Sequence, residues 1–196
     1  MVLNDIAVVD AGYPFRGTIP ETLGSHIAAV QMKDVSLQDG IDWSGCTRTT
    51  LTGKRAPDWL QPGDILIAAR GSHNYAVLVD ERLTSTDLQA VASPHFFIIR
   101  VTREEVLPEF LTWLLNQAPC QRYFEQTAEG SVTKSIRRSV LEQTPVAVPP
   151  RDKQQIIIRM NTTLARERRI ATQLVNNGAQ LMNTIASELL AQPIPR

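Results

Sequence analysis

This sequence has only two cysteines, no long apolar run and no excess of either charge. Cys46 and Cys120 have neither paired spacing nor neighbouring histidines, so a disulfide framework and a zinc site are both poorly supported. The longest apolar runs, residues 65–69 and 96–99, fall far short of the roughly 20 residues that a membrane helix needs. Its 20 basic residues balance 20 acidic ones, which excludes the evenly basic composition of a histone-like protein. Any contact with nucleic acid is therefore expected to be local.

The first residues also lack the basic segment, apolar run and cleavage site of a secretory signal, so we expect a cytoplasmic protein that does not enter a membrane. The 196 residues are 43% apolar, which is enough for one medium domain with an appendage. Residues 1–150 hold 13 Lys/Arg and 17 Asp/Glu, whereas residues 151–196 hold 7 and 3. This contrast predicts two parts: a β-rich domain over residues 1–149 and a helical segment over residues 150–196.

The first part has short apolar runs and dense turn formers, which is typical of strands joined by turns. We predict strands over residues 26–32, 64–69, 75–79 and 95–101, because these runs are rich in β-branched or aromatic residues. Residues 10–20 and 35–53 are predicted to be loops, and residues 146–148 a last short strand before two prolines. With the helices below, the expected fold class is α+β.

Helical patterns follow the strands. A helix is expected to begin at Pro108 and end near Pro119, because Pro and Glu occupy its first turn and apolar pairs recur four residues apart. A second helical segment over residues 120–127 would be capped by Gly130. From residue 151 to about 190 there is no proline and only one glycine, which predicts a single helix roughly 60 Å long.

Apolar side chains recur along this helix at alternating steps of three and four residues, the spacing of a coiled coil. We call these ten positions the helix seam; seven are apolar and two are charged, and they are Ile157, Met160, Leu164, Glu167, Ala171, Leu174, Gly178, Leu181, Ile185 and Glu188. Because the helix is about twice the span of a small domain, we expect the seam to pair with a second copy of the chain, giving a homodimer. Arg166, Arg168 and Arg169 lie mid-helix and suit contacts with a partner helix, or with DNA running alongside.

Cations and hydroxyls cluster at four places in the first part, and such residue types contact phosphates and base edges. The candidate DNA-binding residues are Arg70, Ser72, His73, Asn74 and Tyr75 in a turn after a strand; Lys134, Arg137 and Arg138 after Gly130; Lys54 and Arg55 near Trp59; and Arg16 in a glycine-flanked loop. The alternative for the first turn is a plain exposed hairpin, and for the charge run a solvated surface. Arg16 suits either a minor-groove contact or a loop cap.

Signatures of catalysis on DNA are absent from the sequence. It has no Asn/Asp-Pro-Pro-aromatic tetrapeptide for a flipped base and no glycine-rich turn for a methyl donor. None of its four lysines has Asp or Glu two residues before it, as a common magnesium-dependent nuclease core requires. His26, His73 and His95 lie far apart without metal-ligand spacing, and Asp64 is interpreted as a turn residue. We therefore expect a non-catalytic chain without a metal or a cofactor of its own.

The order of motifs resembles that of the DNA-specificity (S) subunits of type I restriction-modification enzymes. The resemblance rests on LNDI at residues 3–6 with Gly12, PGDILIAARG at 62–71, LPEFL at 107–111, GSVTKSI at 130–136, Leu141, and VAVPPRDKQQI at 146–156. It covers nearly the whole chain, and the PGDILIAARG stretch is the most telling. S subunits of this family carry two target-recognition domains and two helices, whereas this sequence has one of each. The resemblance thus implies a half-length form.

By the logic of that family, two copies would pair their helices antiparallel and read a bipartite palindromic site on double-stranded DNA. Methyltransferase subunits, with a restriction or translocase subunit as a further possible partner, would supply the chemistry and bind S-adenosylmethionine. Two alternatives remain open at this point. One is an adaptor of the same fold that only assembles protein partners. The other is a self-sufficient hydrolase or transferase, which would need an acid-base or metal neighbour at His73 or Asp64.

Overall fold

The computed structural model describes residues 1–71, 73–127 and 135–191, and the chain divides into two compact units, Met1–Gln155 and Ile156–Arg196. Unit 1 is built on a central antiparallel sheet with strand order β1-β9-β6-β7. Its strands are β1 (Ala7–Ala11), β9 (Phe96–Val101), β6 (Ile65–Ala68) and β7 (Ala76–Leu78). A second sheet has the order β5-β2-β8, with β5 (Thr47–Arg48), β2 (Ile27–Val30) and β8 (Gln89–Ala92). A hairpin pairs β3 (Val35–Ser36) with β4 (Gly40–Ile41).

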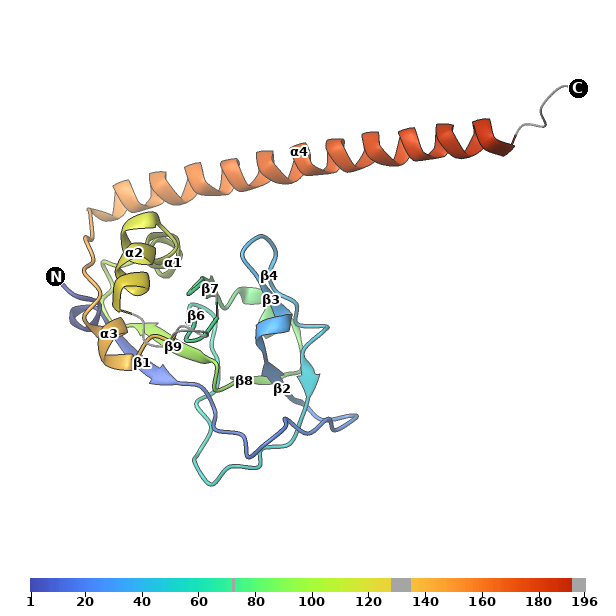
Figure 1. Ribbon diagram of the computed structural model, residues 1–196. Helices are drawn as coiled ribbons and strands as arrows, with labels where there is room; N and C mark the ends of the chain where they lie inside the picture. The colour runs from blue at the N-terminus through green and yellow to red at the C-terminus, as the bar shows by residue number, and fades with distance from the viewer. Residues whose placement is uncertain (72, 128–134, 192–196) are drawn as a thin grey trace, which may run out of the picture. The chain divides into compact units, whose positions relative to one another are not determined.

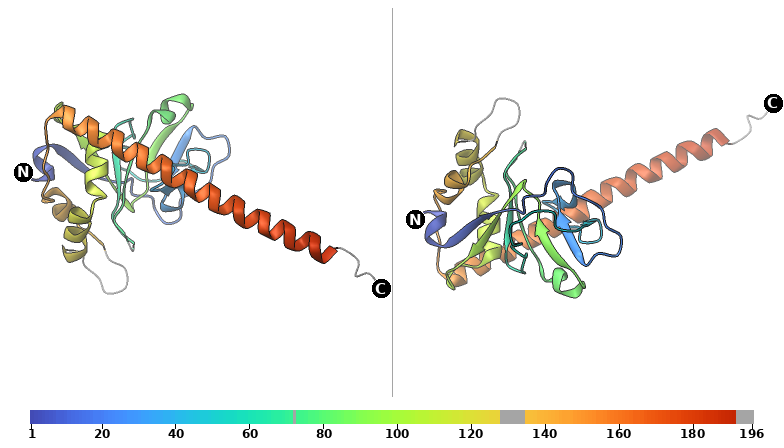
Figure 2. Two further views of the ribbon diagram at one scale, coloured as in Figure 1. Left: turned by 90° about the horizontal axis from the view of Figure 1, so that it is seen from above. Right: turned by 90° about the horizontal axis from the view of Figure 1, so that it is seen from below.

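The central sheet is the middle layer of unit 1, because successive strand side chains point to opposite faces. Ile65 and Ile67 of β6 pack with the helices α1 (Pro108–Leu115), α2 (Ala118–Thr127) and α3 (Arg138–Glu142). Leu66 and Ala68 pack in the opposite direction, with residues of β2, β8 and the β3–β4 hairpin. The helices therefore cover one face of the sheet and the second sheet covers the other, as Figures 1 and 2 show. A smaller cluster around Tyr13 and Val91 lies beyond the second sheet.

Helix α1 follows its sequence pattern closely. Pro108 and Glu109 occupy the first turn, where a missing N–H costs nothing and an acid suits the helix dipole. Phe110, Leu111 and Leu115 are buried. The side chain of Asn116 then pairs with Ala76 of β7, accepting from its N–H at 2.9 Å and donating to its carbonyl at 2.7 Å. This pairing covers backbone groups of the edge strand β7 and ties α1 to the sheet.

The four predicted strands and the long helix are confirmed, since β2, β6, β7 and β9 lie inside the predicted ranges and α4 spans Arg151–Ala191. The prediction of a strand at residues 146–148 is wrong. Only an isolated bridge between Val2 and Pro145 forms there, because Val146 donates a single bond to Met1 and Pro149 and Pro150 have no N–H for a ladder. Gly130, predicted to cap a helix, lies outside the described residues.

The loop predictions are partly wrong. β1 extends to Ala11, and residues 35–53 contain β3, β4 and β5, each only two residues long. Strand β8 and helix α3 also lie where no element was predicted. The first helix was predicted to end near Pro119, but α1 ends at Leu115. Pro119 lies in the first turn of α2, where proline is tolerated.

The described part of unit 2 is the remainder of α4, which Figure 2 shows as one continuous helix. Its apolar side chains are exposed from Met160 onward, and Gly178 has no atom within 4 Å of where a Cβ would lie. The first turn of α4 belongs to unit 1. There the fully buried Gln154 donates to the carbonyls of Glu105 and Pro149 and accepts from the N–H of Leu107. Across the described part of the chain, no helix has both the length and the apolar character needed to cross a membrane.

Candidate nucleic-acid interface

Two segments that are far apart in the sequence meet at one end of the central sheet. The N–H of Ile136 donates to the carbonyl of Ala69 at 3.0 Å, and Arg70 forms an antiparallel bridge with Ser135. The turn after β6 and the segment before α3 therefore lie side by side. We call the exposed side chains gathered here the sheet-end cluster; they are Arg70, His73, Arg137 and Arg138. Lys134 and Ser72, also candidates, lie outside the described residues.

Arg138 opens α3 and has two acidic neighbours. It forms an ion pair with Glu142 at 2.7 Å, one turn along the helix, and a longer one with Asp10 of β1 at 3.8 Å. Its side chain is about half exposed (49%), and exposed ion pairs contribute roughly 0–1 kcal/mol. An approaching phosphate can therefore replace Glu142 at little cost.

Asn74 and Tyr75 have internal partners. The Asn74 side chain is buried and donates to the carbonyl of Ala68 at 2.8 Å, which joins the two arms of the β6–β7 hairpin. Tyr75 is half-buried, and its hydroxyl lies 3.7 Å from the sulfur of Met32. Burial raises the pKa of this hydroxyl. The structure thus gives both residues a bracing role inside the turn that exposes Arg70 and His73.

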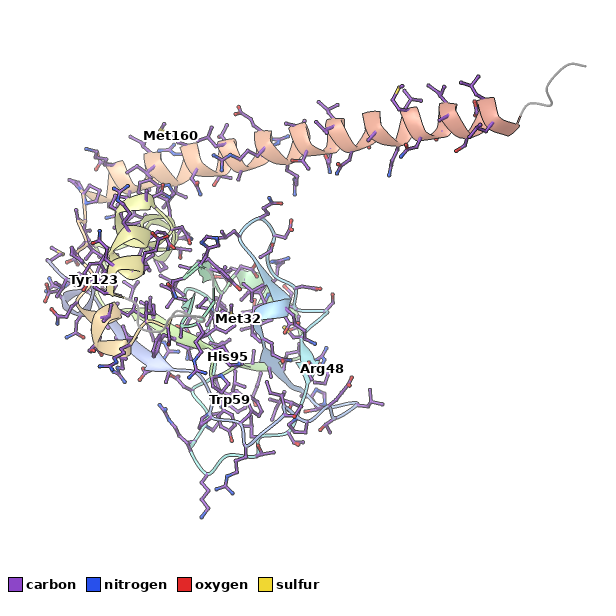
Figure 3. The ribbon with its side chains drawn as sticks, in the orientation of Figure 1. Met32, Arg48, Trp59, His95, Tyr123 and Met160 are labelled. Carbon is purple, nitrogen blue, oxygen red and sulfur yellow. The ribbon has the colours of Figure 1, made fainter. Side chains whose placement is uncertain are left out.

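A second group of cations lies on two long loops that are joined to each other. The hydroxyl of Tyr13 accepts from the N–H of Gly53 at 2.8 Å and donates to its carbonyl at 3.1 Å. The N–H of Arg16 reaches the hydroxyl of Thr52 at 3.4 Å. This brings the exposed side chains of Arg16, Lys54 and Arg55, which we call the loop-pair cluster, to neighbouring loops. Trp59, labelled in Figure 3, is partly buried and packs against the small cluster that contains Tyr13.

Lys33 is an exposed cation that was not predicted from the sequence. It lies in the 3-10 helix η2 (Met32–Asp34), is exposed, and approaches the hydroxyl of Thr47 at 3.4 Å. Its neighbour Met32 contacts the turn after β6, because a Cβ on Gly71 would lie 3.8 Å from the Met32 methyl carbon. Figure 3 labels Met32 and His95, and the backbone carbonyl of His95 accepts the N–H of Ala69 at the same sheet end. Only the tertiary contact reveals this position, because no local motif marks Lys33.

Asp64, the acidic residue named in the hydrolase alternative, has structural partners. Both carboxylate oxygens of the buried Asp64 bind Arg100, at 2.8 and 2.7 Å, and one also accepts the N–H of Gln61. Within residues 1–71, 73–127 and 135–191, no three His, Cys, Asp or Glu side chains are grouped so that they could hold a metal ion. The geometry found at Asp64 is therefore that of a turn braced by an ion pair.

The helix seam is largely exposed. Met160, Leu164 and Leu174 have exposed fractions of 60, 50 and 67%. Leu181 and Ile185 are exposed as well, and Ile157 is half-buried. A further apolar row stands beside the seam, one residue after Leu174, Leu181 and Glu188; its members are Val175, Met182 and Leu189. This row was not predicted, because the helix seam follows a single stripe of the helix. Arg166, Arg168 and Arg169 are exposed between the two apolar stretches of the helix.

The similarity of this chain to known proteins comes from solved structures. No protein-family model and no curated protein matches the sequence. The HsdS subunit from Thermoanaerobacter tengcongensis matches 89% of this chain and 38% of its own length, with a TM-score of 0.60 and 14% identity. The S subunit of a type I restriction-modification system from M. genitalium matches 96% of this chain and 44% of its own, with a TM-score of 0.55 and 13% identity.

A third solved structure, described as the structural basis of complex assembly and conformational transition of the type I restriction-modification system, contributes a chain with a TM-score of 0.62 and 14% identity. It matches 94% of this chain and 42% of its own. The chain thus spans less than half the length of each of these neighbours. The resemblance to specificity subunits is confirmed at the level of the fold: a β-rich domain with small helices, followed by one long helix.

Proposed function

We propose that the chain is a sequence-specific DNA-recognition subunit of a type I restriction-modification complex. The observation that carries the proposal is the structural match to specificity subunits across both the β-rich unit and the long helix, with 89–96% of the chain covered. In this proposal unit 1 reads one half-site on double-stranded DNA. The chain itself performs no catalysis and binds no cofactor.

The sheet-end cluster supports DNA contact. Arg137 and Arg138 extend from one segment and Arg70 and His73 from another, so that phosphate and base-edge donors are present within one surface. Arginine suits both guanine edges and phosphates, since its donors form a planar fork. Because the net charge of the chain is zero, affinity must come from such local clusters rather than from an overall positive field.

The exposed seam of α4 supports a homodimer, because a second copy offers the same apolar stripe. Two copies would present two identical readers, so the recognised site would be bipartite and palindromic. The extra row of Val175, Met182 and Leu189 makes the apolar face wider than a two-stranded coiled coil needs. This supports docking of further helices, and we assign that role to methyltransferase subunits, which would bring S-adenosylmethionine and modify a flipped adenine. A restriction or translocase subunit is a further partner in this proposal.

The adaptor alternative is favoured by one observation: several candidate residues are engaged inside the fold or paired with acids, as Asn74 and Arg138 show. An adaptor would use α4 to assemble proteins without reading DNA.

Mapping of methylated bases separates the two functions. Cells carry this chain together with its neighbouring genes, or the same genes with the chain deleted, and long-read sequencing maps methyladenine across the genome.

The recognition function predicts methylation at one bipartite palindromic motif, which disappears on deletion and is restored by the wild-type chain. A matched chain with Arg70→Ala and His73→Ala should reduce methylation at that motif, while Arg103→Ala, an exposed arginine elsewhere, should leave it unchanged. If the chain is an adaptor, both substituted chains should give the same methylation map as the wild-type chain. A map that does not depend on the chain at all would overturn the proposal.

A further inference from the structure

The turn at residues 22–25 presents the most exposed large apolar side chain among the described residues. Leu23 is 90% exposed, and it precedes Gly24, whose φ is +78°. The N–H of Ser25 donates to the carbonyl of Thr22 at 3.2 Å, which together with the positive φ at the third residue is typical of a type II β-turn. A Cβ on Gly24 would meet no atom within 4 Å, so the tip of the turn stands clear of neighbouring segments.

Both ends of this turn are fixed to β5 and to the residues that follow it. The N–H of Thr22 donates to the carbonyl of Arg48 at 2.8 Å, and the hydroxyl of Ser25 donates to the carbonyl of Thr49 at 2.6 Å. The hydroxyls of Thr22 and Thr50 lie 3.5 Å apart. The turn is thus held at its base while its apolar tip extends outward, so little further ordering is needed when the tip meets a ligand.

The segment that holds the turn also holds the loop-pair cluster. The hydroxyl of Thr52, two residues after Thr50, accepts the N–H of Arg16, and the other two cations of the cluster occupy positions 54 and 55. Two residues extend a chain by no more than about 7 Å. The turn that carries Leu23 and the loops that carry these cations are therefore fixed to neighbouring points of one short segment.

Arg48, labelled in Figure 3, adds a fourth cation beside the turn and lines an open hollow together with His26. Glu21 and Asp87 are the carboxylates that adjoin the turn in the sequence or in this hollow. Cations thus outnumber acids here, whereas residues 1–150 as a whole hold 13 basic and 17 acidic residues. A DNA duplex is a polyanion whose stacked bases form an apolar interior, so it matches an apolar tip set among cations.

We infer that Leu23 is a wedge that enters the minor groove and separates two stacked base pairs, while the surrounding cations contact the flanking phosphates. This inference rests on the proposed function and adds to it a deformation of the DNA. Apolar side chains that enter a base step in this way unstack it and kink the duplex. Pyrimidine–purine steps unstack most easily, so the recognised site should contain such a step at a fixed place.

Leu37 offers a matched comparison within unit 1. It is 63% exposed in the loop of the β3–β4 hairpin. The hollow beside that hairpin is lined by three carboxylates and two cations, which are Asp34, Asp39, Asp42, Lys33 and Arg82. This excess of acids disfavours the approach of phosphates. Leu37 therefore controls for the exposure of a leucine in a loop without the cationic surroundings of Leu23.

The adenine analogue 2-aminopurine, which fluoresces strongly when it is unstacked, tests the wedge. It replaces each adenine in turn in a duplex that carries the motif mapped by methylation, and the full chain is then added. The emission should rise several-fold at one step. Leu23→Ala should abolish this rise and weaken binding about tenfold, because a buried leucine contributes affinity of that order. The slope of log K against log salt should stay unchanged, since no phosphate contact is lost.

Two further variants complete the comparison. Leu23→Met keeps an apolar side chain of similar size and should keep the rise in emission. Leu37→Ala should behave as the wild-type chain does. Both leucines are exposed, so circular dichroism should show the same folded structure for every variant. A rise that persists in Leu23→Ala, or one that is lost in Leu37→Ala as well, overturns the wedge.

Other results would assign Leu23 a different contact and would also overturn the wedge. Weaker binding by Leu23→Ala without any rise in the wild-type emission, together with sensitivity to replacing thymine by uracil, would place the leucine against a thymine methyl group. Unchanged DNA binding with lost methylation in cells would indicate a contact with a protein partner. In each of these cases methylation still depends on the chain, so the proposed recognition function stands. A methylation map that does not depend on the chain removes the function and the wedge together.

Discussion

Arg100 holds the carboxylate of Asp64 with two nearly parallel hydrogen bonds, from Nε to Oδ1 at 2.8 Å and from an Nη atom to Oδ2 at 2.7 Å. Asp64 precedes β6, and Arg100 lies on the neighbouring strand β9. The Asp64 side chain is only 3% exposed, and the hydrogen bonds that Arg100 donates to it raise the pKa of the arginine. The pair therefore fixes the start of β6, the strand that leads directly to the turn carrying Arg70 and His73.

Arg100→Ala should destabilise unit 1 by about 2–4 kcal/mol, because it leaves a buried carboxylate without its charged partner. Urea unfolding followed by circular dichroism measures the loss. Arg122→Ala is the matched control: this arginine is exposed on α2, and its truncation should change stability by less than about 0.5 kcal/mol. A loss below 1 kcal/mol for Arg100→Ala would show that Asp64 finds other partners.

Sequence patterns predicted the elements whose own residues define them. β6 is an apolar run buried on both faces, β9 is rich in aromatic and β-branched residues, and α4 is a long stretch of helix-forming residues without proline. The two-residue strands β3, β4 and β5 were missed because they exist only through pairing with another segment. α3 was missed for a related reason: its five residues are too few to show a helical period.

The candidate site was predicted as separate pieces. Arg70 and Arg137 were each identified from local composition, but their proximity depends on the bond between Ile136 and Ala69, which no local pattern indicates. The inward direction of the Asn74 side chain depends on the opposite arm of a hairpin, so residue type alone could not distinguish it from a base-reading amide. Lys33 was missed because no local motif marks it, and its neighbour Met32 meets the turn after β6 only through a tertiary contact.

Gly12 should not tolerate a side chain. A Cβ at this position would lie 2.0 Å from the carbonyl oxygen of Ser93 and 2.7 Å from its carbonyl carbon, and neither backbone atom can move aside easily. Gly12→Ala should therefore cost about 3 kcal/mol or more. Gly178→Ala is the opposite case, since nothing lies within 4 Å and alanine favours a helix by about 1 kcal/mol. Thermal unfolding and helix content from circular dichroism should move in opposite directions for the two variants.

Stability should depend on Cys46 at alkaline pH. Burial, together with the negative charges of Asp34 and Asp42, raises the pKa of the Cys46 thiol to about 12. In the unfolded chain the thiol loses its proton above about pH 8.5, while the folded chain keeps it, so the unfolded state binds fewer protons and stability falls as pH rises.

Between pH 8 and pH 10 the wild-type chain should therefore lose about 2 kcal/mol more stability than Cys46→Ala, as measured by urea unfolding at both pH values. Other ionisations affect both proteins equally and cancel in the comparison. Equal losses in the two proteins would mean that the folded state admits the Cys46 thiolate.

Arg137→Ala combined with Arg138→Ala should weaken binding to every duplex. If both residues contact phosphates, the slope of log K against log salt should become shallower by about 1–2, because each lost contact retains roughly one counterion. Fluorescence anisotropy over a salt series measures the slope. A double variant of Arg103→Ala and Arg122→Ala removes the same charge from other exposed positions and should leave the slope within error. An unchanged slope for Arg137 and Arg138 would remove them from the interface.

His73 and Asn74 are neighbours with different roles, and their alanine variants should separate DNA binding from folding. Asn74→Ala leaves the carbonyl of Ala68 without its donor inside the hairpin, so it should lower stability by about 1–3 kcal/mol. His73→Ala removes an exposed side chain and should change stability by less than about 0.5 kcal/mol.

The DNA readout should show the reverse order once both variants are compared under conditions where each is fully folded. His73→Ala should weaken binding to the methylated motif more than binding to an unrelated duplex, because a base-edge contact discriminates sequence whereas a phosphate contact does not. Asn74→Ala, when folded, should bind both duplexes nearly as well as the wild-type chain does. If His73→Ala weakens both duplexes equally, the turn after β6 positions the backbone of the DNA, and sequence must be read elsewhere, with the loop-pair cluster of Arg16, Lys54 and Arg55 as the next surface to substitute.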